Sequence, residues 1–193
     1  MTRIIAGRAK GRQLVTPKGD MTRPTAARVR EAAFQLIVDW CGTVGDSAGE
    51  TLNDISFLDL YAGSGAVALE AASRGAAPVW AVEAEKPVAG VIAQNQARTG
   101  LRVNIATRKV EAFLAASPPE TFDIVWVDPP YAVPNSKLAA HLGRLIEGQW
   151  LRPCALVILE RSSRDAPPSW PAEMREYARR GYGETTLYLA TTA

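Results

Sequence analysis

Two glycines and two carboxylates have a spacing that suits the binding of a nucleoside. Gly63 and Gly65 follow an apolar run that contains Asp59, and Glu83 lies twenty positions beyond Gly63, at the expected end of the next strand. Glycines allow a tight turn and let backbone come close to a ligand. An acidic residue at the second strand end can accept hydrogen bonds from both ribose hydroxyls. This pattern predicts a nucleoside site where neighbouring strands end.

Asp59 bears on which nucleoside cofactor is bound. A glycine turn serves the pyrophosphate of nicotinamide cofactors, and Gly63-x-Gly65-x-x-Ala68 also fits that pattern. A carboxylate four residues before the turn suits an ammonium group better than a phosphate, because like charges at close range repel. S-adenosylmethionine offers an adenosine, a sulfonium and an ammonium, so it is the expected cofactor. A nicotinamide-dependent oxidoreductase is the alternative of another class.

A second motif, Asp128-Pro129-Pro130-Tyr131, follows the apolar run FDIVWV. The prolines fix φ and remove two backbone donors, which leaves nearby carbonyls able to accept. The Asp128 carboxylate and a prolyl carbonyl could hold both hydrogens of a nucleobase amine and aim its lone pair at a methyl group. Tyr131 could stack on the base, which is worth roughly 1–3 kcal/mol. Asp128, Pro129 and Tyr131 are therefore the predicted catalytic residues.

Positive charge is concentrated at the beginning of the chain. Residues 1–30 hold eight Arg and Lys and one Asp, a net +7, and the whole chain carries +2, so residues 31–193 carry −5. Such a segment on a mildly acidic body predicts contact with a polyanion, and a solvated tail is the alternative. The RNA-binding candidates are Arg3, Arg8, Lys10, Arg12 and Arg23.

Strand and helix patterns alternate along the rest of the chain. A basic hairpin is expected within the first 19 residues and a helix over 26–40, so residues 1–25 form an extension to a domain of residues 26–193. Continuous apolar runs predict a parallel sheet with helices on both faces. The expected strands are 55–62, 78–84, 103–107, 122–128 and 155–161, with a terminal antiparallel pair at 174–180 and 185–191. The expected helices are 66–74, 86–99, 110–116 and 136–147.

Several classes of protein are disfavoured by the composition. No apolar run approaches the roughly 20 residues of a membrane span, and the N-terminus lacks the apolar core of a signal peptide. Two cysteines, Cys41 and Cys154, form neither a disulfide framework nor a metal set, so no metal and a cytoplasmic location are expected. The single histidine, His141, offers no catalytic dyad and is expected at the surface or in packing.

Several stretches together resemble the RsmD family, bacterial enzymes that methylate the exocyclic N2 of one guanine in 16S ribosomal RNA of the small subunit. The stretches are FLDLYAGSGAVALEAASRGA, VEAEKPV, VDPPY, the opening RIIAGRAKGRQL with TRPTAARVREAAFQLI, and the ending GETTLYLA. The likeness covers nearly the whole chain. DPPY is shared by many amino-group methyltransferases, including DNA adenine enzymes, and the N-terminal stretches are the more specific signal.

The resemblance implies a Rossmann-like class I methyltransferase with a seven-stranded, mostly parallel sheet whose last strand is antiparallel. It implies S-adenosylmethionine as donor, and a monomer that acts on 16S ribosomal RNA within a small-subunit assembly particle. Lys109 stands where the family often carries Asp or Asn, so Val110 would meet the adenine through its backbone. A DNA adenine or cytosine amino methyltransferase and a non-catalytic RNA-binding protein are alternatives. The implied cofactor contacts are Asp59, Gly63, Ser64, Gly65, Glu83, Val110 and Asp128.

Overall fold

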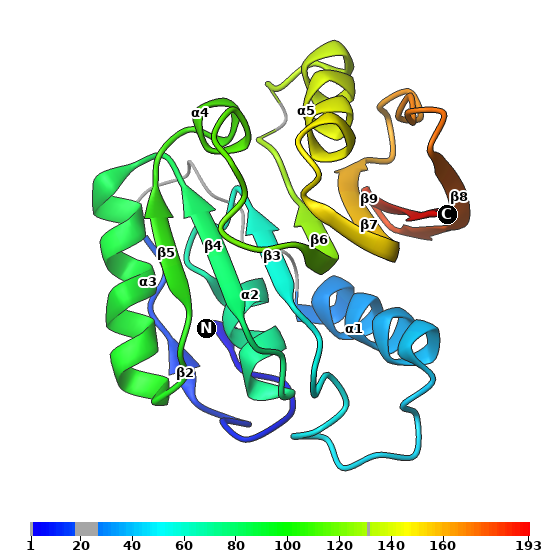
Figure 1. Ribbon diagram of the computed structural model, residues 1–193. Helices are drawn as coiled ribbons and strands as arrows, with labels where there is room; N and C mark the ends of the chain where they lie inside the picture. Colours follow the sequence, from blue (N-terminus) through cyan, green and yellow to red (C-terminus); the bar gives the residue numbers. More distant parts are fainter. Residues whose placement is uncertain (1, 18–26, 131) are drawn as a thin grey trace.

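A seven-stranded sheet forms the centre of the protein, whose computed structural model describes residues 2–17, 27–130 and 132–193 (Figure 1). The strand order is β5-β4-β3-β6-β7-β9-β8. Neighbours from β5 to β7 are parallel, and β9 runs antiparallel to both β7 and β8. The predicted fold class is therefore confirmed. The strands are β3 (Phe57–Leu60), β4 (Val79–Glu83), β5 (Asn104–Thr107), β6 (Phe122–Val127), β7 (Leu151–Ser162), β8 (Met174–Tyr182) and β9 (Thr185–Thr192).

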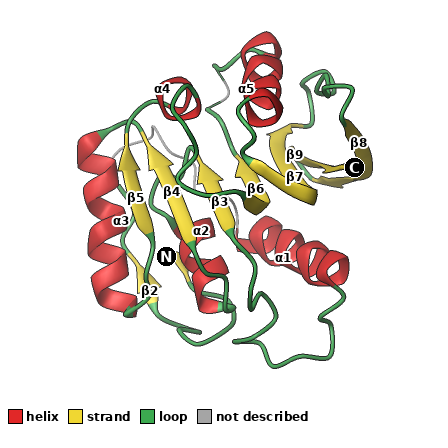
Figure 2. Cartoon of the chain, in the orientation of Figure 1, coloured by secondary structure: helices red, strands yellow, loops and turns green. Residues whose placement is uncertain are grey.

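Helices cover both faces of the sheet (Figure 2). Phe57 and Ile124 pack with α1 (Ala27–Cys41), α2 (Ala66–Ser73) and α3 (Lys86–Thr99) in one core cluster. Leu58 and Val125, the next residues along β3 and β6, pack with α4 (Val110–Leu114) and α5 (Asn135–Glu147) in the other. Successive side chains of a strand point to opposite faces, so both faces of each central strand must be apolar. This requirement explains the continuous apolar runs.

The predicted N-terminal hairpin is present, and it is packed against the domain. β1 (Thr2–Arg3) pairs antiparallel with β2 (Gln13–Leu14). Ile4 and Leu14 are buried in the same core cluster as α1, α2 and α3. The hairpin therefore adds to the helical layer on that face of the sheet. The predicted boundary between residues 25 and 26 lies outside the described residues.

The largest difference from the predicted elements is the start of β7. The apolar run predicts a strand from residue 155, but β7 begins at Leu151. Arg152, Pro153 and Cys154 are exposed, and Cys154 has a positive φ of 58°. The pairing of β6 with β7 shifts register between Phe122 and Ile124. An irregular, exposed start of this kind lacks the apolar signal that marks a buried strand.

No helix in the described ranges has both the length and the apolar character needed to cross a lipid bilayer.

Candidate active site

The strand order reverses at β3, because β3 pairs with β4 on one side and with β6 on the other. In open parallel sheets, ligands bind outside the carboxyl ends of the strands at such a point. β3 ends at Leu60, and the chain continues through Tyr61 and the glycine turn to α2. β6 ends at Val127, directly before Asp128. The two predicted motifs therefore lie at one edge of the sheet, beside each other.

The two glycines of the turn are needed for different reasons. Gly63 has φ +54° and Gly65 has φ +76°, both in the left-handed region that favours glycine. A Cβ on Gly65 would lie 2.8 Å from Cγ2 of Ile92, so a side chain there would collide with α3. A Cβ on Gly63 would meet none of the described residues within 4 Å. Among the residues that the structure describes, none occupies this side of Gly63, so a ligand could approach its backbone there.

Glu83 at the end of β4 holds the turn in place. Its Oε2 accepts a hydrogen bond of 2.9 Å from the backbone N–H of Gly63, and its Oε1 accepts one of 2.9 Å from Glu85. A carboxylate has about four acceptor positions, so both oxygens can accept further hydrogen bonds. The structure brings Glu83 and Gly63 together, as a shared nucleoside site requires.

Asp59 is buried beneath the turn, with 2% of its surface exposed. Its Oδ2 accepts a hydrogen bond of 3.0 Å from the backbone N–H of Ala68, in the first turn of α2. Burial raises the pKa of Asp59 well above its ordinary value, the Ala68 hydrogen bond opposes this, and the charges of Asp128 and Glu83 raise the pKa further. Three carboxylates that act on one another at this edge favour a cationic ligand over a pyrophosphate.

The DPPY corner is tied to the end of β3. The backbone N–H of Asp128 lies 3.5 Å from the carbonyl oxygen of Leu60. Asp128 is half-buried and Pro129 is buried. The carbonyl of Pro130 accepts a hydrogen bond of 2.9 Å from Val133, so that prolyl oxygen is already engaged. Tyr131, the predicted stacking residue, lies outside the described residues.

Val110 and Ser64 also lie at this edge. Val110 is the first residue of α4, which follows β5, and its side chain is buried. Lys109 before it is exposed. Ser64 is buried between the two glycines, and its carbonyl oxygen accepts a hydrogen bond of 3.0 Å from Nδ2 of Asn95. All predicted cofactor residues therefore gather around the ends of β3, β4, β5 and β6.

The basic candidates lie elsewhere. Arg3, Arg8, Lys10 and Arg12 are exposed. The backbone N–H of Arg8 donates to the carbonyl of Ser73, the last residue of α2, so the hairpin tip lies at the opposite end of this helix from the glycine turn (Figure 1). The structure does not bring these residues to the Asp128 corner. Arg23 lies outside the described residues.

A polar pair near the site was not predicted. Tyr61, with a positive φ of 64°, places its hydroxyl 3.1 Å from Nδ1 of His141 on α5. His141 is 2% exposed, and burial lowers its pKa, while Glu111 raises it and Lys137 and Arg144 lower it. Burial also raises the pKa of Tyr61. The pair links the start of the glycine turn to the helix that follows DPPY.

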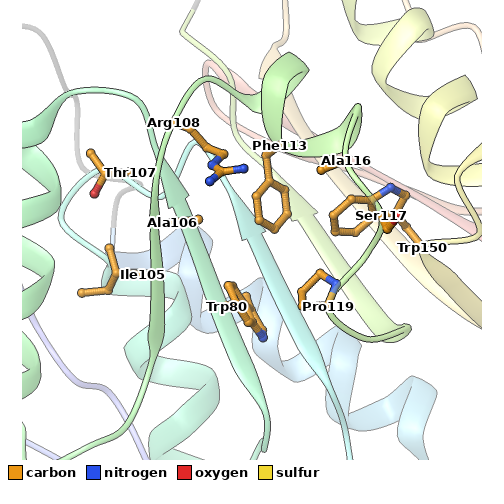
Figure 3. Close-up of a pocket in the computed structure, with 10 residues that line it drawn as sticks. All are labelled: Trp80, Ile105, Ala106, Thr107, Arg108, Phe113, Ala116, Ser117, Pro119 and Trp150. Carbon is orange, nitrogen blue, oxygen red and sulfur yellow. The ribbon is translucent and has the colours of Figure 1, made fainter.

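A pocket is also present beside α4, β4 and β5. This pocket of about 330 Å³ lies on the β4–β5 side of α4 (Figure 3). Trp80, Phe113 and Trp150 line it with aromatic rings, and Thr107, Arg108 and Ser117 are exposed around it. None of the predicted catalytic or cofactor residues lines it. Among the residues that the structure describes, no group of three or more His, Cys, Asp or Glu side chains could hold a metal ion.

The strand order, the antiparallel β9 and the glycine turn at the switch point define a Rossmann-like class I methyltransferase fold. The solved structure named "Putative methyltransferase yhhF from Escherichia coli" has the same fold, with a TM-score of 0.81 and 31% identity over 98% of this chain and 97% of that chain.

The family follows from sequence comparison. A family model described as "Conserved hypothetical protein 95" matches residues 2–191, and the chain belongs to that family. Ribosomal RNA small subunit methyltransferase D of Escherichia coli (strain K12) is 31% identical over 189 residues, which cover 97% of this chain and 88% of that protein. The Haemophilus influenzae protein of the same name is 31% identical over 169 residues, 86% of this chain and 80% of that one. These relatives confirm the resemblance to the RsmD family.

Proposed function

We propose that this protein transfers a methyl group from S-adenosylmethionine to the exocyclic N2 of a guanine in 16S ribosomal RNA of the small subunit. The observation that carries this is the adjacency of two sites: the Asp128-Pro129 corner is joined to the end of β3, where the glycine turn begins. A donor and an acceptor can meet only where both are held side by side. The relatives named as ribosomal RNA methyltransferases indicate the class of acceptor.

The proposed cofactor site has a polar partner for each part of S-adenosylmethionine. Buried Asp59 would face the ammonium group, because the described charges that act on it, Asp128 and Glu83, are both negative and a cation would offset them. Glu83 would accept hydrogen bonds from the ribose hydroxyls, and the backbone of Val110 would meet the adenine. Gly63 would leave room for the methionine part, since no described residue lies within 4 Å of the position that a Cβ would take there. Bound there, the cofactor supplies a methyl group on a positively charged sulfur.

At the acceptor side, Asp128 and the carbonyl of Pro129 would accept the two hydrogens of the guanine amine. This orients the nitrogen lone pair toward the methyl carbon and stabilises positive charge as it develops on nitrogen. The N–C bond forms as the C–S bond breaks, and that electron pair stays on sulfur. Asp128 accepts the proton that the nitrogen loses. Tyr131 would stack on the guanine after the base has turned out of its helix or loop.

The test compares the wild-type protein with Asp128→Asn. Methyl transfer to small-subunit RNA, to small-subunit assembly particles and to DNA is measured with radiolabelled S-adenosylmethionine, and the methylated position is mapped. We expect transfer to guanine N2 in the ribosomal substrate, and a loss of about 10²–10³-fold in the variant, typical for one group that stabilises transition-state charge. S-adenosylhomocysteine should still bind the variant, because the other implied cofactor contacts remain.

Other outcomes point to the alternatives. Methylation of DNA alone would indicate a DNA amino methyltransferase, and RNA binding without turnover would indicate a non-catalytic assembly protein. Binding of a nicotinamide cofactor in place of S-adenosylhomocysteine would indicate an oxidoreductase. Full activity of Asp128→Asn would remove Asp128 from the mechanism. We further propose that the enzyme acts as a monomer, which sedimentation of the active protein checks.

A further inference from the structure

Asn95 on α3 joins the N-terminal segment to the glycine turn. Its side chain is fully buried, with 0% exposed. Its Oδ1 accepts a hydrogen bond of 2.7 Å from the backbone N–H of Val15. Its Nδ2 donates to the carbonyl of Val15 at 2.9 Å and to the carbonyl of Ser64 at 3.0 Å. One carboxamide thus holds both backbone groups of Val15 and, with the same nitrogen, the middle residue of the turn.

The chemistry of this contact requires an amide. A carboxamide has two N–H donors and one acceptor oxygen, and all three functions are used here. An aspartate would keep the acceptor and lose both donors, and an apolar side chain would lose all three. Buried backbone groups that lose their partners carry a large desolvation cost. Asn95 therefore fixes Val15 and Ser64 together rather than separately.

The Ser64 contact matters because of its neighbours. Gly63 and Gly65 both have positive φ, and glycine moves easily between backbone regions, so the peptide of Ser64 needs an external anchor. Asn95 supplies this anchor from the side of α3. Glu83 anchors the other end of the turn through the N–H of Gly63. Contacts from β4 and from α3 therefore both hold the turn, and Asn95 supplies the one from α3 to the carbonyl of Ser64.

We propose that Asn95 is a positioning residue through which the docked N-terminal segment sets the affinity of the glycine turn for its cofactor. Val15 follows β2, whose Leu14 is buried in the core, so docking of the hairpin holds Val15 against Asn95. The N-terminal segment, which is expected to bind RNA, then also stabilises the glycine turn of the cofactor site through Val15 and Asn95. This inference rests on the proposed function in one respect, that S-adenosylmethionine binds at the turn.

The experiment measures the binding of S-adenosylhomocysteine to the full-length protein by calorimetry. Val15→Pro removes the backbone N–H that donates to Asn95, and Val15→Ala removes only the side chain beyond Cβ. We expect Val15→Pro to weaken binding about tenfold, the equivalent of one hydrogen bond, and Val15→Ala to change it less than about twofold. Val15 contacts Asn95 only through its backbone groups, which Val15→Ala keeps. A weaker affinity in Val15→Pro alone would therefore report the loss of the contact with Asn95.

A second pair of variants guards against a general loss of folding. Asn95→Leu removes all three hydrogen bonds that the carboxamide makes to Val15 and Ser64. Gln96→Leu, one residue further on α3, removes a side-chain contact of 2.8 Å to the N–H of Val103, away from the turn. Both should lower the melting temperature, but only Asn95→Leu should weaken cofactor binding by about tenfold or more.

Equal affinities in Asn95→Leu and Gln96→Leu would overturn the inference, as would unchanged binding in Val15→Pro. If the wild-type protein bound no S-adenosylhomocysteine, the proposed function would fail first, and this inference with it. The wild-type titration therefore distinguishes the two failures.

Discussion

Glu70, in the middle of α2, accepts a hydrogen bond of 2.7 Å from the backbone N–H of Ile5, 65 positions earlier in the chain. Its second oxygen accepts from Ala6 at 2.9 Å and from Nε of Arg74 at 2.9 Å. Nε of Arg30 on α1 lies 4.0 Å from Oε2 of Glu70, the oxygen that accepts from Ile5. The carboxylate is fully buried. One charged side chain therefore joins the hairpin, α1 and α2.

We expect Glu70→Ala to lower the free energy of unfolding by about 3–5 kcal/mol, because it leaves buried arginines without their counter-ion. Urea denaturation followed by circular dichroism measures the change. Glu31→Ala, an exposed glutamate on α1, is the control and should change stability by less than about 0.5 kcal/mol. A loss below about 1 kcal/mol for Glu70→Ala would mean that the hairpin is held mainly by its apolar contacts.

Asp59 predicts a dependence of stability on pH. Its pKa is raised in the folded protein, so the folded state keeps this proton to higher pH than the unfolded state does. The free energy of unfolding should therefore fall as the pH rises from about 4, the ordinary pKa of aspartate, through the raised value. Asp59→Asn removes this fall and keeps a side-chain oxygen for the N–H of Ala68.

Urea denaturation at pH 5 and pH 8 checks this prediction. The stability of Asp59→Asn relative to wild type should increase between the two pH values, and the variant should bind S-adenosylhomocysteine more weakly, because the ammonium loses its carboxylate. A relative stability that stays constant with pH would contradict the raised pKa. Unchanged cofactor binding would contradict the assigned role of Asp59.

Gly63→Ala and Gly65→Ala should separate binding from stability. Both place alanine at positive φ, at a cost of about 1 kcal/mol. Only the Cβ at position 65 collides with Ile92, so Gly65→Ala should lose more stability. The Cβ at position 63 meets no described residue within 4 Å and should block the cofactor at little further cost in folding. Thermal melts and titration with S-adenosylhomocysteine measure the two effects, and full binding by Gly63→Ala would exclude close approach of the ligand there.

The basic hairpin predicts a salt effect. Replacing Arg8, Lys10 and Arg12 together by glutamine should weaken RNA binding and reduce the slope of log K against log salt by about two, at roughly 0.7–0.9 per phosphate contact. The matched control replaces Arg175, Arg179 and Arg180, three exposed arginines on β8. Equal slopes of log K against log salt for both triple variants would assign the effect to overall charge. The basic residues of the hairpin would then be solvated and would not contact RNA.

The architecture was predictable because its signals are local. Apolar runs, glycines and prolines marked every helix and strand, and the spacing of Gly63 and Glu83 correctly predicted that they lie together. The start of β7 was missed because Arg152, Pro153 and Cys154 are exposed and carry no apolar pattern.

The supporting contacts of the site were not predictable in the same way. Glu70 and Asn95 bind backbone groups, and a backbone group has no residue type that a pattern could match. The single charged residue within AVALEAAS was the one available signal for Glu70. The partners of Asn95 are 80 and 31 positions away, so only the packed fold reveals them.

The place of the hairpin tip at the far end of α2 has a consequence for the length of RNA that the enzyme engages. α2 has eight residues, so its ends are about 12 Å apart. A short oligonucleotide that carries the target base could fill the Asp128 corner without reaching Arg8, whereas a folded ribosomal domain could touch both. Substitutions in the hairpin tip should then lower the rate of methylation of a folded ribosomal domain and leave the rate for a short oligonucleotide unchanged. The ratio of these two rates would report whether the enzyme recognises its substrate through the tip.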